Sequence, residues 1–317
     1  AKTAVEPKQE EKAPLQRPDR PNTADNTVAL TIFDSKYQDM WACWARWYWA
    51  SNSKIKALDV VVLDEQAFTF MGTWMKEHPG IVRKVLRGQD LVKNKYADGP
   101  RRLWPSDLYQ HAIWSTVLEL MQDGEDVFHF DTDAFVFNDP WSLFEDVWPQ
   151  EMKVADIVTA CDCFGPGCKE FGCSLNPGVM FFRNSDPTKN ILKSILRRWE
   201  EGTVPADKNQ RSDMFMLNQY LVDHGQCSLK TFGERNRHSP CPGLNFTWAL
   251  FTHGTIARGS SCGDPLAPEH AARCRKQKPP IAIVHGRNGL EVKFCIHPPA
   301  LPGEATTTAP LPTSTTT

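Results

Sequence analysis

Short apolar runs rich in β-branched residues alternate with longer amphipathic stretches along the middle of this chain. Residues 27–33 have the composition of a buried strand, residues 37–51 have the spacing of a helix, and residues 58–63 have the composition of a second strand. Two strands that are joined through a helix pair in parallel, because the crossover returns the chain to the same edge of the sheet. The alternation therefore predicts an α/β fold.

The same alternation continues toward the C-terminus without an internal repeat. It predicts further helices at residues 108–122, 190–200 and 213–222, and further strands at residues 126–130, 156–160, 178–182 and 281–284. We therefore expect one domain over residues 27–297, built on a mixed, mostly parallel sheet flanked by helices. Residues 1–26 carry almost no large apolar side chain, which predicts a flexible stem. Residues 298–317 are rich in Pro, Ala and Thr, which is typical of a flexible tail that carries O-linked sugars.

The charge balance and the hydropathy of the chain argue against two classes of protein. The 36 Lys and Arg residues face 38 Asp and Glu residues, so the chain lacks the basic excess of a nucleic-acid-binding protein. No stretch approaches the roughly 18 consecutive apolar residues that a membrane-spanning helix needs. Neither a nucleic-acid partner nor a membrane span within these residues is expected.

Ten cysteines are more than a reduced cytosolic enzyme usually carries, which favours an oxidising compartment. Structural disulfides are the favoured interpretation, and a zinc cluster is the alternative. A zinc cluster would need a repeated Cys-x2-Cys spacing, which the run Cys161, Cys163, Cys168 and Cys173 lacks. Asn245 begins the one Asn-x-Thr sequence with a permitted middle residue, so it is a potential glycan site if the protein enters the secretory pathway.

Aromatic residues crowd the first predicted helix. Trp41, Trp44 and Tyr48 are spaced as the stripe of a helix that packs on a sheet. Aromatic side chains that stack on sugar rings would be the alternative interpretation. We expect core packing.

Two carboxylates directly follow an apolar strand. Residues 127–130 run into Asp131 and Asp133, and side chains two residues apart in an extended segment point the same way. Carboxylates at the end of a buried strand are costly unless a cation or strong hydrogen bonds offset them. Ligands of open α/β sheets bind at the carboxyl ends of the strands, where this pair is expected to lie. The pair therefore indicates a site for Mn²⁺ or Mg²⁺, although many Asp-x-Asp tripeptides are merely solvated turns.

A wider set of motifs surrounds this pair. Asn138-Asp-Pro-Trp141 follows it, and residues 176–184 continue with Asn176-Pro-Gly178 and a further apolar strand. With these motifs, nearly all of residues 27–290 resemble the GT-A-fold glycosyltransferases. The likeness is strongest to the nucleotide-diphospho-sugar transferase family, which includes plant and algal arabinosyl- and xylosyltransferases.

The resemblance implies an activity and a set of site residues. It implies transfer of a hexose or pentose from a nucleotide sugar, expected to be UDP-linked, to a hydroxyl of a glycan or glycoprotein, with retention of the anomeric configuration. The departing phosphate oxygen would then accept the proton, whereas in an inverting enzyme Asp213 would be the base. The implied metal ligands are Asp131, Asp133 and His285; the implied nucleotide-binding residues are Thr31, Asp34, Asp64, Asp131 and Arg287; and the implied residues near the sugar or the acceptor are Asp162, Asn176 and Asp213.

The sequence departs from the family pattern at two positions. The family often has a lysine in the helix before the metal strand, but residues 110–114 contain none, and Met214 replaces a usual glutamine. Arg287 or Arg183 would supply the missing cation. Simpler roles also stay open, because His285 can be a packed histidine, Asp162 can cap a turn and Asp213 can cap a helix.

The departures leave two rival functions open. One is a catalytically silent, secreted carbohydrate-binding protein on the same fold, and the other is a metal-dependent phosphohydrolase, which usually needs more metal ligands than this sequence shows. The cysteines, the sequon, the stem and the habit of the family together predict the Golgi lumen. The chain is then expected to be the catalytic fragment of a type II membrane protein whose anchor lies upstream of Ala1.

Overall fold

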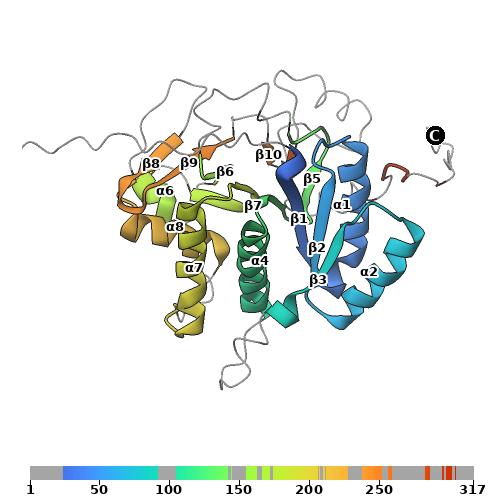
Figure 1. The fold of residues 1–317 in the computed structure, drawn as a ribbon, viewed down its shortest axis with the longest axis horizontal. Coiled ribbons are helices and arrows are strands. Elements are labelled where there is room, and N and C mark those ends of the chain that lie inside the picture. The colour runs from blue at the N-terminus through green and yellow to red at the C-terminus, as the bar shows by residue number, and fades with distance from the viewer. Residues whose placement is uncertain are drawn as a thin grey trace, which may run out of the picture.

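The computed structural model of the chain describes residues 24–91, 105–141, 144, 155–162, 166–171, 174–205, 207, 210, 212–227, 238–251, 256–258, 283–285, 295, 298–301 and 304 (Figure 1). Within these residues, the main sheet has eight strands in the order β3-β2-β1-β4-β7-β6-β9-β8. The strands are β1 (Thr27–Phe33), β2 (Ala57–Val62), β3 (Lys84–Arg87), β4 (Asp126–Phe130), β6 (Ile157–Asp162), β7 (Ser174–Phe182), β8 (His238–Cys241) and β9 (Phe246–Leu250).

The predicted mixed sheet is confirmed. Strands β3, β2, β1 and β4 are mutually parallel, and β6 also pairs in parallel with β9. Strand β7 is antiparallel to both β4 and β6, and β8 is antiparallel to β9. A second sheet of three short strands, in the order β10-β11-β5, consists of β5 (Ala134–Val136), β10 (Ile256–Arg258) and β11 (Ile283–His285).

Helices cover both faces of the main sheet. Helices α1 (Gln38–Ala50) and α2 (Glu65–Glu77) pack on one face, where Phe33, Phe128 and Phe130 contribute sheet side chains to a shared apolar core. Helices α4 (Pro105–Gln122), α7 (Asp186–Glu200) and α8 (Asp213–His224) pack on the other face, against side chains such as Leu30 and Phe182. Figure 1 shows α1 and α2 together at the right of the sheet and α7 and α8 toward the left. Successive side chains of a strand point to opposite faces of the sheet, so alternate residues of each strand pack against different helices.

The aromatic stripe of α1 belongs to the core, as predicted. Trp41 and Trp44 are fully buried and Tyr48 is 5% exposed. The ring of Trp41 stacks on Phe33 at a centroid distance of 5.1 Å, and the ring of Trp44 stacks on Tyr48 at the same distance. These side chains are therefore inaccessible to a sugar ring.

The predicted elements are all present, but several observed ones were not predicted. The unpredicted elements are α2, β3, β5, α6 (Pro166–Phe171), β8, β9 and β10. Most of them are short, so they show too few residues for a periodic pattern to stand out. Strand β7 also begins at Ser174, before the predicted start at residue 178, because the chain stays paired through Pro177 by means of a bulge against β6.

Residues near the C-terminus pack against α1. A disulfide joins Cys43 to Cys295, and the guanidinium of Arg46 forms a two-bonded ion pair with the carboxylate of Glu304. Leu301 is 3% exposed and belongs to the core on this face. Packed residues therefore occur beyond residue 297, the expected end of the domain.

Two disulfides confirm part of the prediction from the cysteines. Besides Cys43 and Cys295, Cys227 pairs with Cys241 and joins the end of α8 to β8. The other six cysteines lie outside the described residues or in elements whose side chains are not described. Asn245 of the sequon is exposed, in the turn that precedes β9. None of the helices in the described ranges is long and apolar enough to cross a membrane.

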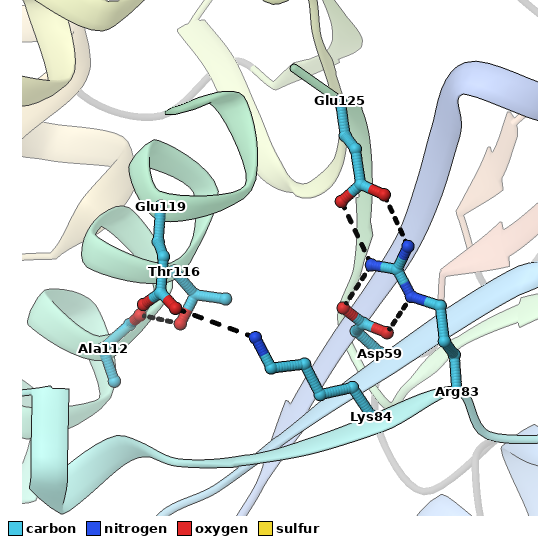
Figure 2. A network of polar contacts seen from close by, with 7 residues as sticks. All are labelled: Asp59, Arg83, Lys84, Ala112, Thr116, Glu119 and Glu125. Atoms are coloured by element: carbon cyan, nitrogen blue, oxygen red, sulfur yellow. Dashed lines mark hydrogen bonds and ion pairs between the residues drawn. The ribbon is translucent and has the colours of Figure 1, made fainter. Parts of the chain in front are cut away.

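A charged network ties the amino-terminal ends of three strands together. Arg83 donates two hydrogen bonds to the fully buried carboxylate of Asp59, at 2.8 and 2.7 Å, and two more to Glu125 (Figure 2). The flanking residue Lys84 lies 3.7 Å from Glu119 of α4. Arg83 precedes β3 and Glu125 precedes β4, so the network lies at the edge of the sheet opposite to the carboxyl ends of these strands. Its role is to offset the buried charge of Asp59.

Candidate active site

Three aspartates follow three neighbouring parallel strands. Asp34 comes directly after β1, Asp64 follows the end of β2, and Asp131 comes directly after β4. Strand β1 pairs with both β2 and β4 in parallel, so these aspartates lie at the same edge of the sheet. This is the edge at which ligands of α/β sheets bind.

Asp34 and Asp64 organise the loops that they begin. Asp34 accepts a hydrogen bond of 3.0 Å from the main-chain N–H of Lys36. Asp64 accepts one of 2.9 Å from the N–H of Ser35 and one of 2.8 Å from the N–H of Ala67, and so caps α2 while it holds the loop after β1. Partial burial of Asp64 would raise its pKa, but these hydrogen bonds outweigh burial and lower the pKa below its ordinary value. The two carboxylates therefore shape the expected nucleoside loop.

Thr31 lies deeper than expected. It is fully buried within β1, between Val60 and Phe130 of the neighbouring strands, and its hydroxyl oxygen has no hydrogen-bond partner among the described residues. The structure does not bring its side chain to the surface of the site edge.

The Asp-Thr-Asp segment is a tight turn, so the prediction of an extended segment is wrong. The main-chain N–H of Ala134 donates a hydrogen bond of 2.9 Å to the carbonyl of Asp131, which closes a turn over residues 131–134. The turn is needed because β4 belongs to the main sheet and β5 to the small one. The indole N–H of Trp44 anchors the turn from α1, with a bond of 2.8 Å to the Ala134 carbonyl.

Tyr109 and His129 both approach the Oδ1 atom of Asp131. The hydroxyl of Tyr109, on α4, donates a hydrogen bond of 2.7 Å to Asp131 Oδ1. His129 is fully buried in β4; its Nδ1 lies 2.8 Å from the carbonyl oxygen of Pro177 and its Nε2 lies 3.9 Å from Asp131 Oδ1. A carbonyl can only accept, so Nδ1 carries the proton of that bond. The Asp131 side chain is 27% exposed and hence accessible to a ligand.

Asp213 joins this group from the first residue of α8. Burial and the nearby negative charge of Asp131 raise the pKa of Asp213 to about 7, although the N–H of Met214 and the side-chain amide of Gln110 donate hydrogen bonds to it. The alternative role of Asp213 as a helix cap is not observed, because Ser212 is the residue that caps α8. Asp213 therefore lies within electrostatic reach of Asp131, as the resemblance implies for residues of one site.

Tyr109 lies within electrostatic reach of three aspartates. Burial first, and then the negative charges of Asp131, Asp213 and Asp133, raise the pKa of the Tyr109 phenol well above its ordinary value. The phenol consequently stays protonated and acts as a donor. The structure thus brings Asp213 to Asp131 and Asp133, from which it is about 80 residues away in the sequence.

Asn176 shapes the main chain beside Asp131. Its side-chain oxygen accepts a hydrogen bond of 2.9 Å from the N–H of Gly178, at the bulge between β6 and β7. The carbonyl of Gly178 then accepts a bond of 2.8 Å from the N–H of Asp131. Asn176 is therefore next to the site and holds the bulge that supports Asp131. The main chain of Asp162 pairs with Ser174 at the end of β6, and its side chain is not described.

The main chain of His285 lies beside the acidic turn. His285 pairs with Ala134, the residue after Asp133, where β11 runs antiparallel to β5. The imidazole is not among the described side chains, and Arg287 lies outside the described residues. The structure thus places the main chain of His285 next to the Asp131–Asp133 turn, and the role of the side chain stays a prediction.

The carboxylates suit a hard divalent ion. Among the described residues, no three His, Cys, Asp or Glu side chains form a group that would hold a metal by itself. Mg²⁺ and Mn²⁺ instead favour one or two carboxylates together with water and substrate phosphates. Burial first, and then the negative charge of Asp131, raise the pKa of Asp213; a cation at this edge would offset the second of these effects.

Sequence reasoning missed Tyr109, Gln110 and Trp44 as residues that contact the site. For Tyr109 and Gln110, the available signal was a pair of polar side chains near the start of the helix that precedes β4. For Trp44 no signal existed, because its contact with Ala134 joins residues 90 positions apart.

Comparisons with known proteins identify the family and the fold of the chain. Residues 53–233, more than half of the chain, match the nucleotide-diphospho-sugar transferase family. A search of curated protein sequences finds no match. Among solved structures, the galactosyltransferase LgtC in complex with donor and acceptor sugar analogs is similar over 87% of this chain and 98% of its own, at 14% identity and a TM-score of 0.50.

Two further solved structures are similar to this chain, with lower TM-scores. Mouse xyloside xylosyltransferase 1 matches over 83% of this chain and 98% of its own, at 14% identity and a TM-score of 0.49. The glycosyltransferase GlyE of Streptococcus pneumoniae matches over 86% of this chain and 61% of its own, at 13% identity and a TM-score of 0.47. The sheet order and the likeness to LgtC identify the fold as GT-A. With the family match over residues 53–233, the chain belongs to the nucleotide-diphospho-sugar transferase family of glycosyltransferases.

Proposed function

We propose that the protein transfers a sugar from a UDP-linked donor to a hydroxyl of a glycan or glycoprotein, in a reaction that needs Mn²⁺ or Mg²⁺ and retains the anomeric configuration. The observation that carries the proposal is the proximity of Asp213 to Asp131 at the carboxyl end of β4, where burial first and then the charge of Asp131 raise the pKa of Asp213. Family membership supports the donor class.

Asp131 and Asp133 would hold the ion, with His285 completing its ligands. When bound, the ion would supply a positive charge that stabilises the departing diphosphate. Asp131 is suited to this task because its carboxylate is partly exposed while its main-chain N–H is fixed on Gly178. Asp34 and Asp64 would position the nucleoside through the loop after β1, whose N–H groups they already hold.

Asp213 would act beside the donor sugar. A carboxylate whose pKa is about 7 exchanges between its charged and neutral forms near neutral pH, and so can either stabilise positive charge on the sugar ring or accept a proton. In a retaining reaction the departing phosphate oxygen takes the proton of the acceptor hydroxyl, and Asp213 serves the first of these roles. In an inverting reaction it would be the base.

The same proposal includes a location in the Golgi lumen. The disulfides Cys43–Cys295 and Cys227–Cys241 support an oxidising compartment, and the exposed Asn245 is accessible for glycosylation there. Expression in a secretory host, followed by enzymatic removal of N-linked sugars, tests this part. We expect a loss of mass at Asn245, and an unmodified Asn245 would contradict it.

The test of the function is a panel of donors with and without Mn²⁺. UDP-xylose, UDP-arabinose, UDP-galactose and UDP-glucose should be incubated with simple glycoside acceptors, and released UDP and glycosylated product measured together. We expect metal-dependent product from at least one donor, with an α-linkage from an α-linked donor by NMR. Binding of glycans without any turnover would instead support the rival of a silent carbohydrate-binding protein, which the absence of a lysine in α4 favours.

A further inference from the structure

Helix α4 presents two neutral donors to the acidic site. Tyr109 donates its hydroxyl hydrogen to Asp131 Oδ1 at 2.7 Å, and the neighbouring Gln110 donates a side-chain hydrogen bond to Asp213. The whole of α4 contains no lysine or arginine. The two carboxylates are therefore oriented by α4 without being neutralised by it.

We propose that Tyr109 is a positioning residue, which fixes the carboxylate of Asp131 for a divalent cation. This inference rests on the proposed function, because it assigns a partner to the metal ligand named there. A hydrogen bond to one oxygen of a ligating carboxylate selects one orientation of the group.

The surroundings of Tyr109 make it rigid enough for this role. Tyr109 packs against the core on its face of the sheet, and the helical residues Ala112 and Ile113 that follow it are buried. His129, whose Nε2 lies 3.9 Å from the same Oδ1 atom, is fully buried and held by the carbonyl of Pro177. The main-chain N–H of Asp131 is bonded to Gly178. Asp131 is thus fixed at its main chain by β7 and at its side chain by Tyr109.

The variant Tyr109→Phe can weaken binding of the ion without preventing folding of the protein. Removal of the hydroxyl leaves the ring and its packing in place, so Tyr109→Phe should fold. Loss of a hydrogen bond to a ligating side chain typically weakens metal binding 10- to 100-fold. We expect about 10-fold weaker Mn²⁺ binding, a similar rise in the Mn²⁺ concentration that gives half-maximal turnover, and a kcat at saturating Mn²⁺ within a few-fold of the original value.

A matched control variant is Tyr48→Phe. The Tyr48 hydroxyl is also buried and donates a bond of 2.9 Å to the carbonyl of Ile55, away from the carboxylates. This variant loses the same chemical group and should lower the unfolding temperature without a change in Mn²⁺ affinity. A purely structural role for Tyr109 would give the same result as Tyr48→Phe.

The experiment is a titration of the purified protein with Mn²⁺ in the presence of UDP, with free Mn²⁺ measured by electron paramagnetic resonance, alongside a thermal melt. Weaker Mn²⁺ binding by Tyr109→Phe, at an unfolding temperature close to that of the unsubstituted protein, supports the proposal. Equal Mn²⁺ binding by Tyr109→Phe and the unsubstituted protein overturns the positioning role alone. Absence of Mn²⁺ binding by the unsubstituted protein overturns the metal dependence in the proposed function, and the positioning role with it.

Discussion

The indole N–H of Trp44 lies 2.8 Å from the carbonyl oxygen of Ala134, the residue that ends the acidic turn. Ala134 also pairs with His285, so one residue joins α1, the Asp131–Asp133 turn and the strand of the expected third metal ligand. A fully buried aromatic side chain of the core thereby fixes the end of the site.

Replacement of Trp44 by Phe should affect both stability and the site. The loss of the hydrogen bond and of part of the ring should lower the free energy of unfolding by about 1–3 kcal/mol, because the Ala134 carbonyl is left buried without this donor. Mn²⁺ affinity should fall as well. Urea unfolding and Mn²⁺ titration measure the two effects, and Trp49→Phe is the control because Trp49 is 42% exposed. Equal Mn²⁺ affinity in Trp44→Phe would show that the bond does not support the site.

The Arg83 network should contribute to stability and not to activity. Arg83→Ala leaves the fully buried Asp59 without its bidentate partner, which should lower the free energy of unfolding by about 2–4 kcal/mol. Lys84→Ala is the control, since it removes only a 3.7 Å pair between two exposed side chains and should cost less than about 1 kcal/mol. Turnover at saturating substrate should be unchanged in both. Similar unfolding curves for the two variants would contradict this account of the network.

The pKa of Asp213 predicts a pH dependence of stability in the metal-free protein. Because the folded-state pKa of about 7 lies above the ordinary value of 3.8, the folded protein holds this proton more tightly than the unfolded chain does. Stability should therefore fall as pH rises from about 4 to about 7. The variant Asp213→Asn has no carboxyl group at this position, so its stability should not fall in this way. Above pH 7 its free energy of unfolding should exceed that of the unsubstituted protein by about 1–3 kcal/mol, and near pH 4 there should be no such difference. Urea unfolding in EDTA at several pH values measures this, and a gain that is constant with pH would contradict it.

The two described disulfides should differ in their contribution to stability. The Cys43–Cys295 bond spans 252 residues and the Cys227–Cys241 bond spans 14. In the chain-entropy description, removal of the longer link costs about 5 kcal/mol and removal of the shorter one about 3 kcal/mol. Paired Cys-to-Ser variants, unfolded in guanidinium chloride, allow the comparison. A larger loss from the Cys227–Cys241 pair would reverse the expected order.

The sequence was sufficient to predict the sheet because its central strands are long apolar runs. The strands at residues 27–33 and 126–130 were predicted with their observed bounds, because most of their side chains are apolar and all of them are buried. Helix α2 was missed although Asp64 caps it and Ala67, Met71 and Trp74 form its buried stripe. That pattern was present, but Asp64 was interpreted only as a ligand-binding residue.

The chemistry of the site was less accessible from the sequence than its location. The family pattern indicated Asp131, Asp133 and Asp213, and the structure brings these three around Tyr109. The conformation of the Asp-Thr-Asp segment was predicted incorrectly, because the change from the main sheet to the small sheet is a tertiary feature. Contacts such as Tyr109 to Asp131 depend on how α4 packs, which periodicity does not determine.

The most direct test of the central claim is whether UDP release depends on Mn²⁺ and on the carboxylate of Asp131. UDP released from the most active donor should be measured over a range of Mn²⁺ concentrations for the unsubstituted protein, for Asp131→Asn and for the control Asp123→Asn, whose carboxylate lies on an exposed turn. We predict Mn²⁺-dependent release by the unsubstituted protein and by Asp123→Asn, and a loss of at least about 100-fold in Asp131→Asn. UDP release that is independent of Mn²⁺, or unchanged in Asp131→Asn, would contradict the account.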